Sequence, residues 1–423
     1  MSGATPRARN RHHWWVLAAL LAGIALGTWV QAAGGPGVRA VLPVVESIGT
    51  LWLNALRMTV GPLVFAMLVS AIAGVADAMA TGRLASRAVS WFAVLLLLAG
   101  TLAVLLSQGL LLLWPLDHGV AEAFVAGTAQ GATAAPATMD WHQFMQALLP
   151  PNIVAAAADN AILALVVFAT LFGFAATRLP APQRATLTGF FTAMAEAMVI
   201  IVHWVLLAAP LGVFALALGV GRQAGLHAAG LLLHYVTFVS LVIVLATLLI
   251  YPVVAWRSRL PLRRFTVEIA PVQAVAASTQ SSLATLPVMI ECARERLGIA
   301  PRVGHLVLPL AVAVFRYTSP LGNLGVCFFV AALYGIELSL LQMAAAVVVA
   351  FAVSVGSVGL PGQVSFVASV APICFALGLP TEALGILVAV EIVPDIFRTI
   401  GNVTADLAVT AVVDESAGHG RED

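Results

Sequence analysis

The sequence predicts an all-α polytopic membrane protein, and three observations carry this prediction. First, 61% of the 423 residues are hydrophobic and only 9% are charged, and the mean hydropathy is +1.02. These values lie well outside the range of soluble domains. Second, apolar segments long enough to cross a bilayer recur along the chain. Third, two later apolar segments are interrupted midway by small and turn-forming residues.

The first 256 residues contain six continuous apolar segments. A window of about 19 residues places them near 14–33, 41–77, 87–115, 152–177, 187–219 and 227–256. Several exceed the roughly 20 residues that a straight crossing needs, so we expect tilted helices. The first segment follows a basic stretch similar to the start of a signal peptide, but no small-residue cleavage site closes it and further spans follow. We interpret it as a retained helix.

The two interrupted segments come after residue 256. Segment 263–297 is broken by ASTQSSLATLP, and segment 341–378 is broken by SVGSVGLPGQ. Non-helical backbone at membrane depth is tolerated only where it is buried in protein or lines a wet cavity, so both segments are predicted to be re-entrant hairpins. Full spans near 303–333 and 381–413 each follow one hairpin. This order, hairpin and helix twice, predicts an inverted repeat with a solute site where the broken segments meet.

Arginine placement predicts cytoplasmic N- and C-termini. With the N-terminus inside, the cytoplasmic side carries Arg7, Arg9, Arg11, Arg83, Arg87, Arg178, Arg184, Arg257, Arg259, Arg263, Arg264, Arg294, Arg296 and Arg302. The opposite side then receives only Arg39 and Arg222. The loop 116–151 contains no arginine, as expected for an external loop. The first hairpin therefore enters from the cytoplasm and the second from outside.

The last span carries a line of polar residues. They are spaced 4, 3, 4 and 4 apart and are Glu391, Asp395, Arg398, Asn402 and Asp406. At about 100° per residue they occupy one narrow sector of a helix. Ionisable groups at membrane depth are costly, so they normally face a protein-lined cavity and serve an ion or a solute. The pattern predicts movement of a charged solute.

Other classes of protein find little support. The net charge is +1 and every basic residue is arginine, which leaves no basic patch suited to nucleic acid. The cysteines, Cys292, Cys327 and Cys374, are isolated in the sequence and suggest neither a disulfide framework nor a metal motif. No Gly-x-Ser-x-Gly elbow supports an intramembrane hydrolase. We therefore expect a protein that is not an enzyme and holds no cofactor.

Five segments, from residue 14 to 413, resemble the dicarboxylate/amino acid:cation symporters, which include the glutamate transporters. They are EIVPDIFRTIGNVTAD from Glu391, STQSSLATLP from Ser278, GLPG from Gly359, LRMTVGPLVF from Leu56 and APLGVFAL from Ala209. The resemblance implies eight transmembrane helices plus two re-entrant helical hairpins in an inverted-repeat elevator transporter. It also implies a homotrimer held by a scaffold of the earlier helices.

The resemblance further implies a division of the chain by role. Residues 1–86 would form the N-terminal tail and two mostly scaffold helices, and 87–115 a third helix in the transport core. Residues 116–256 would hold the external loop, the scaffold and trimerisation helices and the sixth helix. Residues 257–413 would form the C-terminal transport core, and 414–423 a cytoplasmic tail. An arginine-only basic set is compatible with a bacterial inner membrane.

Substrate contacts are likewise implied by the resemblance. Arg398 would face the side-chain carboxylate of aspartate or glutamate, and a guanidinium fork suits a carboxylate. Asp395 would take the amino group, Asn402 the α-carboxylate, and Thr399 would add a hydroxyl. Further expected substrate-binding residues are Ser319, and Ser281, Ser282, Leu360, Pro361 and Gly362 at the hairpin tips. Asp395 favours an amino acid, because C4-dicarboxylates have no ammonium group to pair with it.

One sodium site of the family departs from the pattern. Where the family carries Asn-Met-Asp-Gly-Thr, this chain has FRYTS, so Phe315 and Tyr317 replace an amide and a carboxylate. In the third helix, Phe92, Leu95 and Leu96 replace hydroxyl-bearing ligands. Sodium needs a shell of oxygen donors. We therefore expect one family cation site to be abolished.

The core charges predict the coupling ion. Glu391, Asp395 and Asp406 contribute −3 and Arg316 with Arg398 contributes +2, which leaves −1. An acidic amino acid adds −1, and sealing a charge of −2 at low dielectric is unfavourable. We expect H⁺ coupling with Glu391 or Asp406 as carrier and Arg316 as a tethered counter-ion. A residual Na⁺ at Asn402 and Asp406 is left open.

The sequence thus predicts uptake of aspartate or glutamate by cation symport, with reduced sodium dependence. Two alternatives stay open at this stage. Within the carrier class, the solute would be a C4-dicarboxylate or a neutral amino acid, since Phe397 and Gln280 reshape the pocket. In another class, the same fold would serve as an anion channel or a sensor. The expected partners are a small anionic substrate and membrane lipid.

Overall fold

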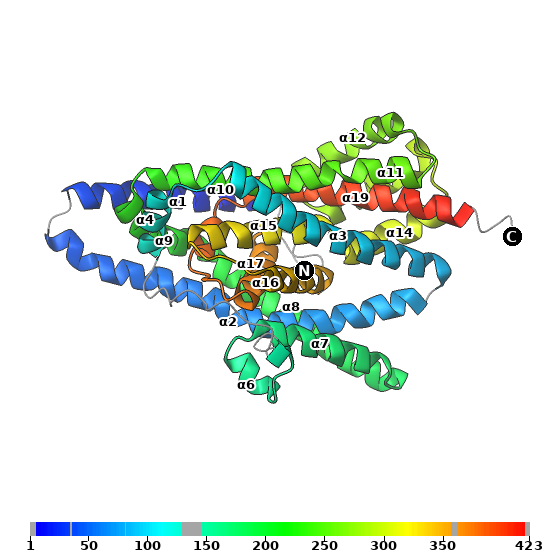
Figure 1. The fold of residues 1–423 in the computed structure, drawn as a ribbon, viewed down its shortest axis with the longest axis horizontal. Helices are drawn as coiled ribbons and strands as arrows, with labels where there is room; N and C mark the ends of the chain where they lie inside the picture. Colours follow the sequence, from blue (N-terminus) through cyan, green and yellow to red (C-terminus); the bar gives the residue numbers. More distant parts are fainter. Residues whose placement is uncertain are drawn as a thin grey trace.

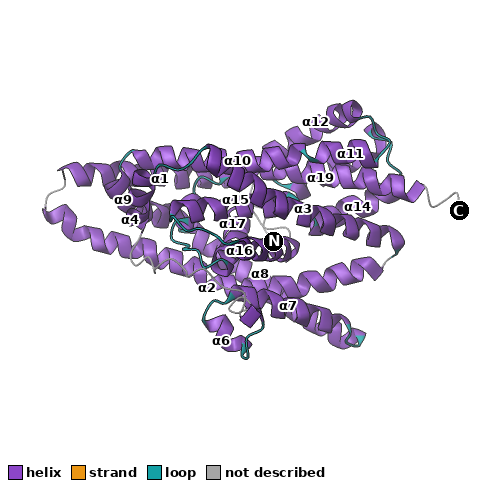
Figure 2. Cartoon of the chain, in the orientation of Figure 1, coloured by secondary structure: helices purple, strands orange, loops and turns teal. Residues whose placement is uncertain are grey.

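Helices make up nearly all of the regular structure, and no strand occurs among the described residues (Figure 2). The computed structural model describes residues 6–33, 36–80, 82–128, 145–146, 148–356 and 362–418. The helices form an elongated bundle in which α2, the longest helix, runs along one side (Figure 1). Six helices of the described part are long and apolar enough to cross a membrane. This arrangement matches the predicted all-α polytopic class.

The helices up to Arg257 follow the predicted apolar segments, except for α4, which lies in the predicted external loop 116–151. They are α1 (Pro6–Ala33), α2 (Pro36–Ala80), α3 (Arg83–Leu113), α4 (His118–Thr128), α6 (Ile153–Ala158), α7 (Ile162–Thr177), α8 (Ala181–Leu207), α9 (Ala209–Ala224), α10 (His227–Leu248) and α11 (Ile250–Arg257). Helix α1 packs closely on α9, where a Cβ at Gly27 would collide with the carbonyl oxygen of Leu218. Glycine is needed there because the two backbones touch.

Two predicted continuous helices are broken in the structure. Segment 152–177 divides into α6 and α7 at Asn160, which has a φ of 54°. Asparagine tolerates this left-handed backbone better than most residues. Segment 187–219 divides into α8 and α9 at Ala208, two residues before Pro210. A proline here starts a new helix because its ring clashes with the preceding turn. Uniform apolarity hides both breaks from the hydropathy pattern.

The remaining helices contain the interrupted segments. They are α12 (Leu262–Thr279), α13 (Ser282–Glu291), the π-turn η1 (Cys292–Arg296), α14 (Pro301–Val314), α15 (Thr318–Leu333), α16 (Leu340–Gly356), α17 (Gly362–Ala376), α18 (Leu384–Leu387) and α19 (Ile392–Gly418). The break between α12 and α13 falls at Gln280, with a φ of 49°, inside the predicted interruption. The second predicted interruption begins in the last turn of α16 and ends in the first turn of α17, and its residues 357–361 lie outside the described part of the chain.

Both predicted full spans after residue 256 are also divided. Segment 303–333 unwinds at Phe315–Tyr317, between α14 and α15. Segment 381–413 is a short α18, a turn, and then α19, whose first turn contains Pro394. Proline fits the first turn of a helix because its missing N–H would have no intrahelical partner there. The unwound backbone of both segments therefore lies in the C-terminal half.

The centre of the bundle is formed by α15 and α19. In the span of α19, 78% of residues are buried inside the protein, against 17% for α8. Helices α3, α10, α12, α14 and α15 all pack against α19. In α8, by contrast, Phe190 and Trp204 are exposed, as expected for a face directed toward lipid or another protein. The predicted polar line on α19 therefore sits inside the bundle, next to the almost fully buried α15.

Candidate functional site

A narrow cavity between α15, α17 and α19 gathers most of the predicted polar residues. Its walls are formed by Arg316, Thr318, Ser319, Asn323, Ser365, Phe366, Glu391, Asp395, Arg398 and Asn402. The unwound segment before α15 and the turn before α19 both contribute, since broken helices place side chains and backbone ends at the same depth. The cavity is therefore lined mainly by charged and polar groups inside an apolar bundle.

Arg398 is buried, with 8% of its surface exposed, and two protein groups hold it. Its Nη1 donates to Asn323 Oδ1 at 3.0 Å, and its Nη2 lies 3.5 Å from Glu391 Oε2. Glu391 also accepts a short hydrogen bond from the hydroxyl of Tyr235 on α10. A buried guanidinium needs such partners because an uncompensated charge at low dielectric is costly. The position of the guanidinium is therefore fixed by a series of contacts that runs from Tyr235 through Glu391 and Arg398 to Asn323.

Asn402 joins α19 to the start of α15. Its Oδ1 accepts from the backbone N–H of Thr318 at 2.9 Å and lies 2.9 Å from the Thr318 hydroxyl. The first N–H groups of a helix have no intrahelical acceptor, so this amide oxygen caps α15. With Oδ1 used in this way, Nδ2 of Asn402 is the group left to donate to a solute. A carboxylate is the matching acceptor.

Ser319 is the second residue of α15 and links that helix to α16. Its Oγ accepts from Asn323 Nδ2 at 3.1 Å and from Ser354 Oγ of α16 at 2.9 Å. Thr399 behaves differently, because its hydroxyl donates back to the carbonyl oxygen of Asp395 at 2.9 Å. Thr399 is not among the residues that line the cavity.

Arg316 and Asp406 occupy the region where the sequence predicts a tethered counter-ion. Arg316 donates to Ser365 Oγ on α17 at 3.3 Å, and its charge attracts both Asp395 and Asp406. Asp406 is 0% exposed, and neither of its carboxylate oxygens accepts a hydrogen bond in the described part of the chain. Asp406 thus feels the field of Arg316 without a hydrogen bond to it. A buried carboxylate without a donor calls for a proton or a cation.

An aromatic stack occupies the place of the altered sodium motif. The rings of Phe92 and Phe315 lie parallel, with centroids 4.7 Å apart and planes inclined by 10°. The Tyr317 hydroxyl donates to the carbonyl oxygen of Ala246 at 2.9 Å, so it is already committed. Leu95 and Leu96 are also buried. Among these side chains only Tyr317 carries an oxygen, so they offer a cation fewer oxygen donors than the amide and carboxylate of the family motif.

Several predicted residues lie elsewhere. Ser281 accepts from the backbone N–H of Ala284 at 3.3 Å and caps α13, and neither Ser281 nor Ser282 lines the cavity. Gly362 begins α17, and Leu360 and Pro361 lie outside the described residues. Within the described ranges, no group of three or more His, Cys, Asp or Glu side chains is placed to hold a metal ion.

The sequence offered no signal for four residues of the site. Tyr235 sits in an apolar helix, and Asn323 lies outside the FRYTS segment. Ser365 and Phe366 on α17 likewise lack a distinctive pattern. Each enters the site through tertiary packing, which periodicity along one helix does not reveal.

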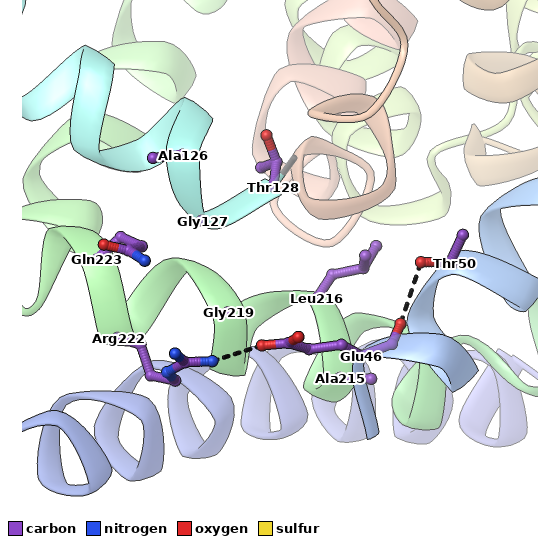
Figure 3. Close-up of a pocket in the computed structure, with 10 residues that line it drawn as sticks. All are labelled: Glu46, Thr50, Ala126, Gly127, Thr128, Ala215, Leu216, Gly219, Arg222 and Gln223. Atoms are coloured by element: carbon purple, nitrogen blue, oxygen red, sulfur yellow. Dashed lines mark hydrogen bonds and ion pairs between the residues drawn. The ribbon is translucent and has the colours of Figure 1, made fainter. Parts of the chain in front are cut away.

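A second cavity lies away from the polar line of α19. It is lined by Glu46, Thr50, Ala126, Gly127, Thr128, Ala215, Leu216, Gly219, Arg222 and Gln223 (Figure 3). There Arg222 Nη1 and Glu46 Oε1 form an ion pair at 2.6 Å, which joins α9 to α2. The charges at this position already satisfy each other. In the first cavity, by contrast, Nη2 of the lining residue Arg398 makes no hydrogen bond.

A charged interior enclosed by apolar helices, with unwound segments at the same depth, is the arrangement of a protein that moves a polar solute across a membrane. The chain belongs to the sodium:dicarboxylate symporter family, whose family model matches residues 13–416. It is accordingly a multi-pass membrane transporter rather than an enzyme.

Similar proteins include carriers with different named substrates. The proton/glutamate-aspartate symporter of Escherichia coli (strain K12) is 30% identical, with 95% of this chain and 91% of the relative covered. The neutral amino acid transporter B(0) of Homo sapiens is 30% identical, covering 92% of this chain and 77% of the relative. The excitatory amino acid transporter 3 of Mus musculus is 25% identical, with 98% of this chain and 87% of the relative covered.

Proposed function

We propose that this protein takes up aspartate or glutamate by symport with protons. The observation that carries the proposal is the buried Arg398, which shares one cavity with Asp395 and the donor side of Asn402. A guanidinium, a carboxylate and an amide N–H₂ match the side-chain carboxylate, the ammonium and the α-carboxylate of an acidic amino acid. The name of the E. coli relative, a proton/glutamate-aspartate symporter, agrees with this solute.

Proton coupling follows from competition for Arg398. A solute carboxylate that binds the guanidinium competes with Glu391, whose Oε2 lies 3.5 Å from Nη2. A proton on Glu391 would end that competition, because a neutral carboxyl no longer needs the guanidinium. Tyr235 would still provide a hydrogen-bonding partner. Glu391 is therefore the proposed proton carrier, and the stacked rings of Phe92 and Phe315 support a reduced role for sodium. Asp406 remains a second candidate for the proton or a residual Na⁺.

A neutral amino acid is the second candidate solute, and one observation favours it. Glu391 already compensates the charge of Arg398, so the cavity does not require a side-chain carboxylate. The Homo sapiens relative is named a neutral amino acid transporter. For a neutral solute, Glu391 would stay paired with Arg398 throughout, and one net charge fewer would enter the cavity. A C4-dicarboxylate is less suited, because Asp395 would lack a cationic partner in the solute.

The proposed architecture has eight membrane spans and two re-entrant hairpins, α12 with α13 and α16 with α17. We propose a homotrimer in the cell inner membrane, with both termini cytoplasmic. The exposed aromatic residues of α8 suit a subunit interface. In this arrangement, residues 257–413 and 87–115 would move as a transport core against the helices of residues 1–86 and 116–256.

Uptake into proteoliposomes tests the proposal. Purified protein is reconstituted, and entry of radiolabelled glutamate, alanine and succinate is measured under an imposed pH gradient, a sodium gradient, or neither. We expect saturable glutamate uptake driven by the pH gradient, with competition by aspartate. Uptake that needs a sodium gradient and ignores the pH gradient would refute proton coupling. Conductance without solute competition would instead indicate a channel.

A further inference from the structure

Two buried thiols lie next to each other between α15 and α17, although the cysteines are far apart in the sequence. Cys327 Sγ and Cys374 Sγ lie 3.6 Å apart. Both side chains are 0% exposed, and both thiols are free. The sulfur atoms of a disulfide are about 2.05 Å apart, so the two need to approach by about 1.5 Å. Cys292, the third cysteine, is also buried but bonds to the carbonyl oxygen of Glu268.

The thiol pair joins two walls of the solute cavity. Cys327 follows Asn323 by one turn of α15, and Cys374 follows Phe366 by about two turns of α17. Asn323 and Phe366 both line the cavity. A covalent link at this level would therefore fix the spacing of α15 and α17 next to the solute site.

The polar contacts indicate which wall moves. Asn323 and Asn402, two residues of the cavity wall, are only 2% and 3% exposed, so we expect a solute to reach them only when a wall moves. Helix α15 is tied to α19 by the bonds of Thr318 to Asn402 and of Arg398 to Asn323. Helix α17 contributes Ser365, whose hydroxyl accepts a weaker 3.3 Å bond from the segment before α15. By these polar bonds, α17 is held to α15 less firmly than α15 is held to α19, so we expect the α17 wall to part first.

We propose that Cys327 and Cys374 form an oxidation site whose disulfide fastens α17 to α15, holds the cavity closed and stops transport. In the reaction each thiol gives up one proton and one electron, and a sulfur–sulfur bond forms. A diazene such as diamide takes up both protons and both electrons and becomes the hydrazine. A dithiol reductant restores the two thiols by exchange. This role goes beyond the proposed function and does not depend on which amino acid is carried.

The test uses the full-length protein in proteoliposomes. Wild type, Cys327→Ala, Cys374→Ala and the matched control Cys292→Ala are reduced, treated with diamide, and then reduced again with dithiothreitol. Glutamate uptake is measured at each stage. The link is detected by mass spectrometry after denaturation and alkylation, as a joined peptide pair lacking two hydrogen atoms. Alanine keeps these buried positions apolar, and circular dichroism checks that each variant is folded.

Diamide should link the two cysteines and abolish uptake in wild type and in Cys292→Ala, and dithiothreitol should restore it. Cys327→Ala and Cys374→Ala should keep their uptake after diamide treatment. The inference is overturned if no linked peptide forms or if the linked protein transports normally. It is also overturned if diamide lowers the uptake of Cys327→Ala and Cys374→Ala as much as that of wild type. Hydrogen exchange of the α17 amides gives a readout that needs no solute. If untreated protein carries no glutamate, the proposed function fails. The disulfide lock is then tested by hydrogen exchange alone. Slower exchange of the α17 amides in the linked form supports the lock, and unchanged exchange overturns it.

Discussion

At the scale of single residues, Arg398 connects the protein's own charges to those of a solute. Its Nη1 donates to Asn323, while Nη2 lies beside Glu391 but makes no hydrogen bond. Part of the guanidinium's hydrogen-bonding capacity is therefore available, and its orientation is fixed before a solute arrives. Preorganised donors bind more tightly because little side-chain freedom is lost on binding.

Replacing Arg398 by alanine tests the assigned substrate contact. We expect Arg398→Ala to abolish the rise in melting temperature that aspartate or glutamate produces in wild type, since a ligand that binds only the folded state stabilises it by an amount that grows with the logarithm of its concentration over Kd. Losing one partner of a buried charged contact costs about 2 to 5 kcal/mol of binding. Arg184→Ala is the matched control, because Arg184 pairs with Asp77 at the surface. A full-size shift in Arg398→Ala would show that the acidic solute binds elsewhere.

Replacing Glu391 by glutamine tests the proton carrier. The glutamine side chain would keep an acceptor for the Tyr235 hydroxyl but would carry no charge at any pH. We expect Glu391→Gln to bind glutamate at least as well as wild type and to lose the pH dependence of that binding. The measurement is the thermal shift from glutamate between pH 5.5 and 8.5, taken in steps of about one pH unit, which resolve the protonation of a single group. An unchanged pH dependence would transfer the proton to Asp406.

Replacing Tyr235 by phenylalanine tests the hydrogen bond that supports Glu391. A bond to a charged group contributes about 1.5–3 kcal/mol, against about 0.5–1.5 kcal/mol for a neutral acceptor. Tyr235→Phe should therefore lower the melting temperature of the purified protein more than Tyr317→Phe does. Tyr317 is the matched control, since it is equally buried and donates to a backbone carbonyl. Equal losses in both variants would indicate that the bond to Glu391 has no special strength.

At the scale of helices, the close approach of α15 to α19 sets the position of Arg398. Gly322 of α15 lies directly against the guanidinium, and a Cβ there would collide with Arg398 Cζ and Nη1. The colliding atoms are the far end of a flexible side chain, so the protein can fold with the guanidinium displaced. Gly322 thus shapes the solute site without touching the solute.

We expect Gly322→Ala to fold normally and to lose acidic-ligand binding. The added methyl pushes the guanidinium out of its place, and a shift of about 1 Å costs on the order of 10²-fold in a positioned site. Gly109→Ala in α3 is the matched control, because nothing lies within 4 Å of a Cβ there. The thermal shift with glutamate measures binding, and the melting temperature without ligand measures folding. Wild-type binding by Gly322→Ala would contradict the described position of Arg398.

The sequence predicted the helices better than their breaks. Long apolar segments identify α1, α2, α3 and α10, because hydropathy over about 19 residues reports membrane burial directly. It also predicted the interruption at Gln280, where small and polar residues stand out, whereas segment 303–333 was predicted as one full span and unwinds at Phe315–Tyr317. The breaks at Asn160 and Ala208 were missed, since a change of backbone angle leaves hydropathy unchanged. Local geometry of this kind depends on one residue and its packing.

The candidate site was predicted on one helix and only in part elsewhere. The line from Glu391 to Asn402 follows helical periodicity, so its shared direction could be read from spacing. Tyr235 and Asn323 join it from other helices, and the hairpin residue Ser281 does not reach the cavity. Contacts between helices depend on their relative rotation and depth, which one sequence does not specify.

At the scale of the whole molecule, an ion pair links the two halves of the chain. Arg57 Nη2 of α2 lies 2.8 Å from Glu382 Oε1, just before α18, and 28% and 20% of these side chains are exposed. Arg57 lies near the middle of α2 (Pro36–Ala80), and its side chain pairs with Glu382. Nε of Arg57 and Oε2 of Glu382 make no hydrogen bond in the described part of the chain. The pair is thus a single charged contact between α2, an expected scaffold helix, and the expected transport core.

A double-mutant cycle tests whether this contact stabilises the described arrangement. Arg57→Ala and Glu382→Ala should each lower the melting temperature, because each leaves a half-buried charge unpaired. The double variant should melt above the value expected from adding the two losses, by an amount that corresponds to about 1 kcal/mol of coupling. Arg184→Ala with Asp77→Ala is the matched control, since that pair is more exposed and spans 3.5 Å. Strict additivity at Arg57 and Glu382 would mean that this ion pair does not stabilise the described arrangement.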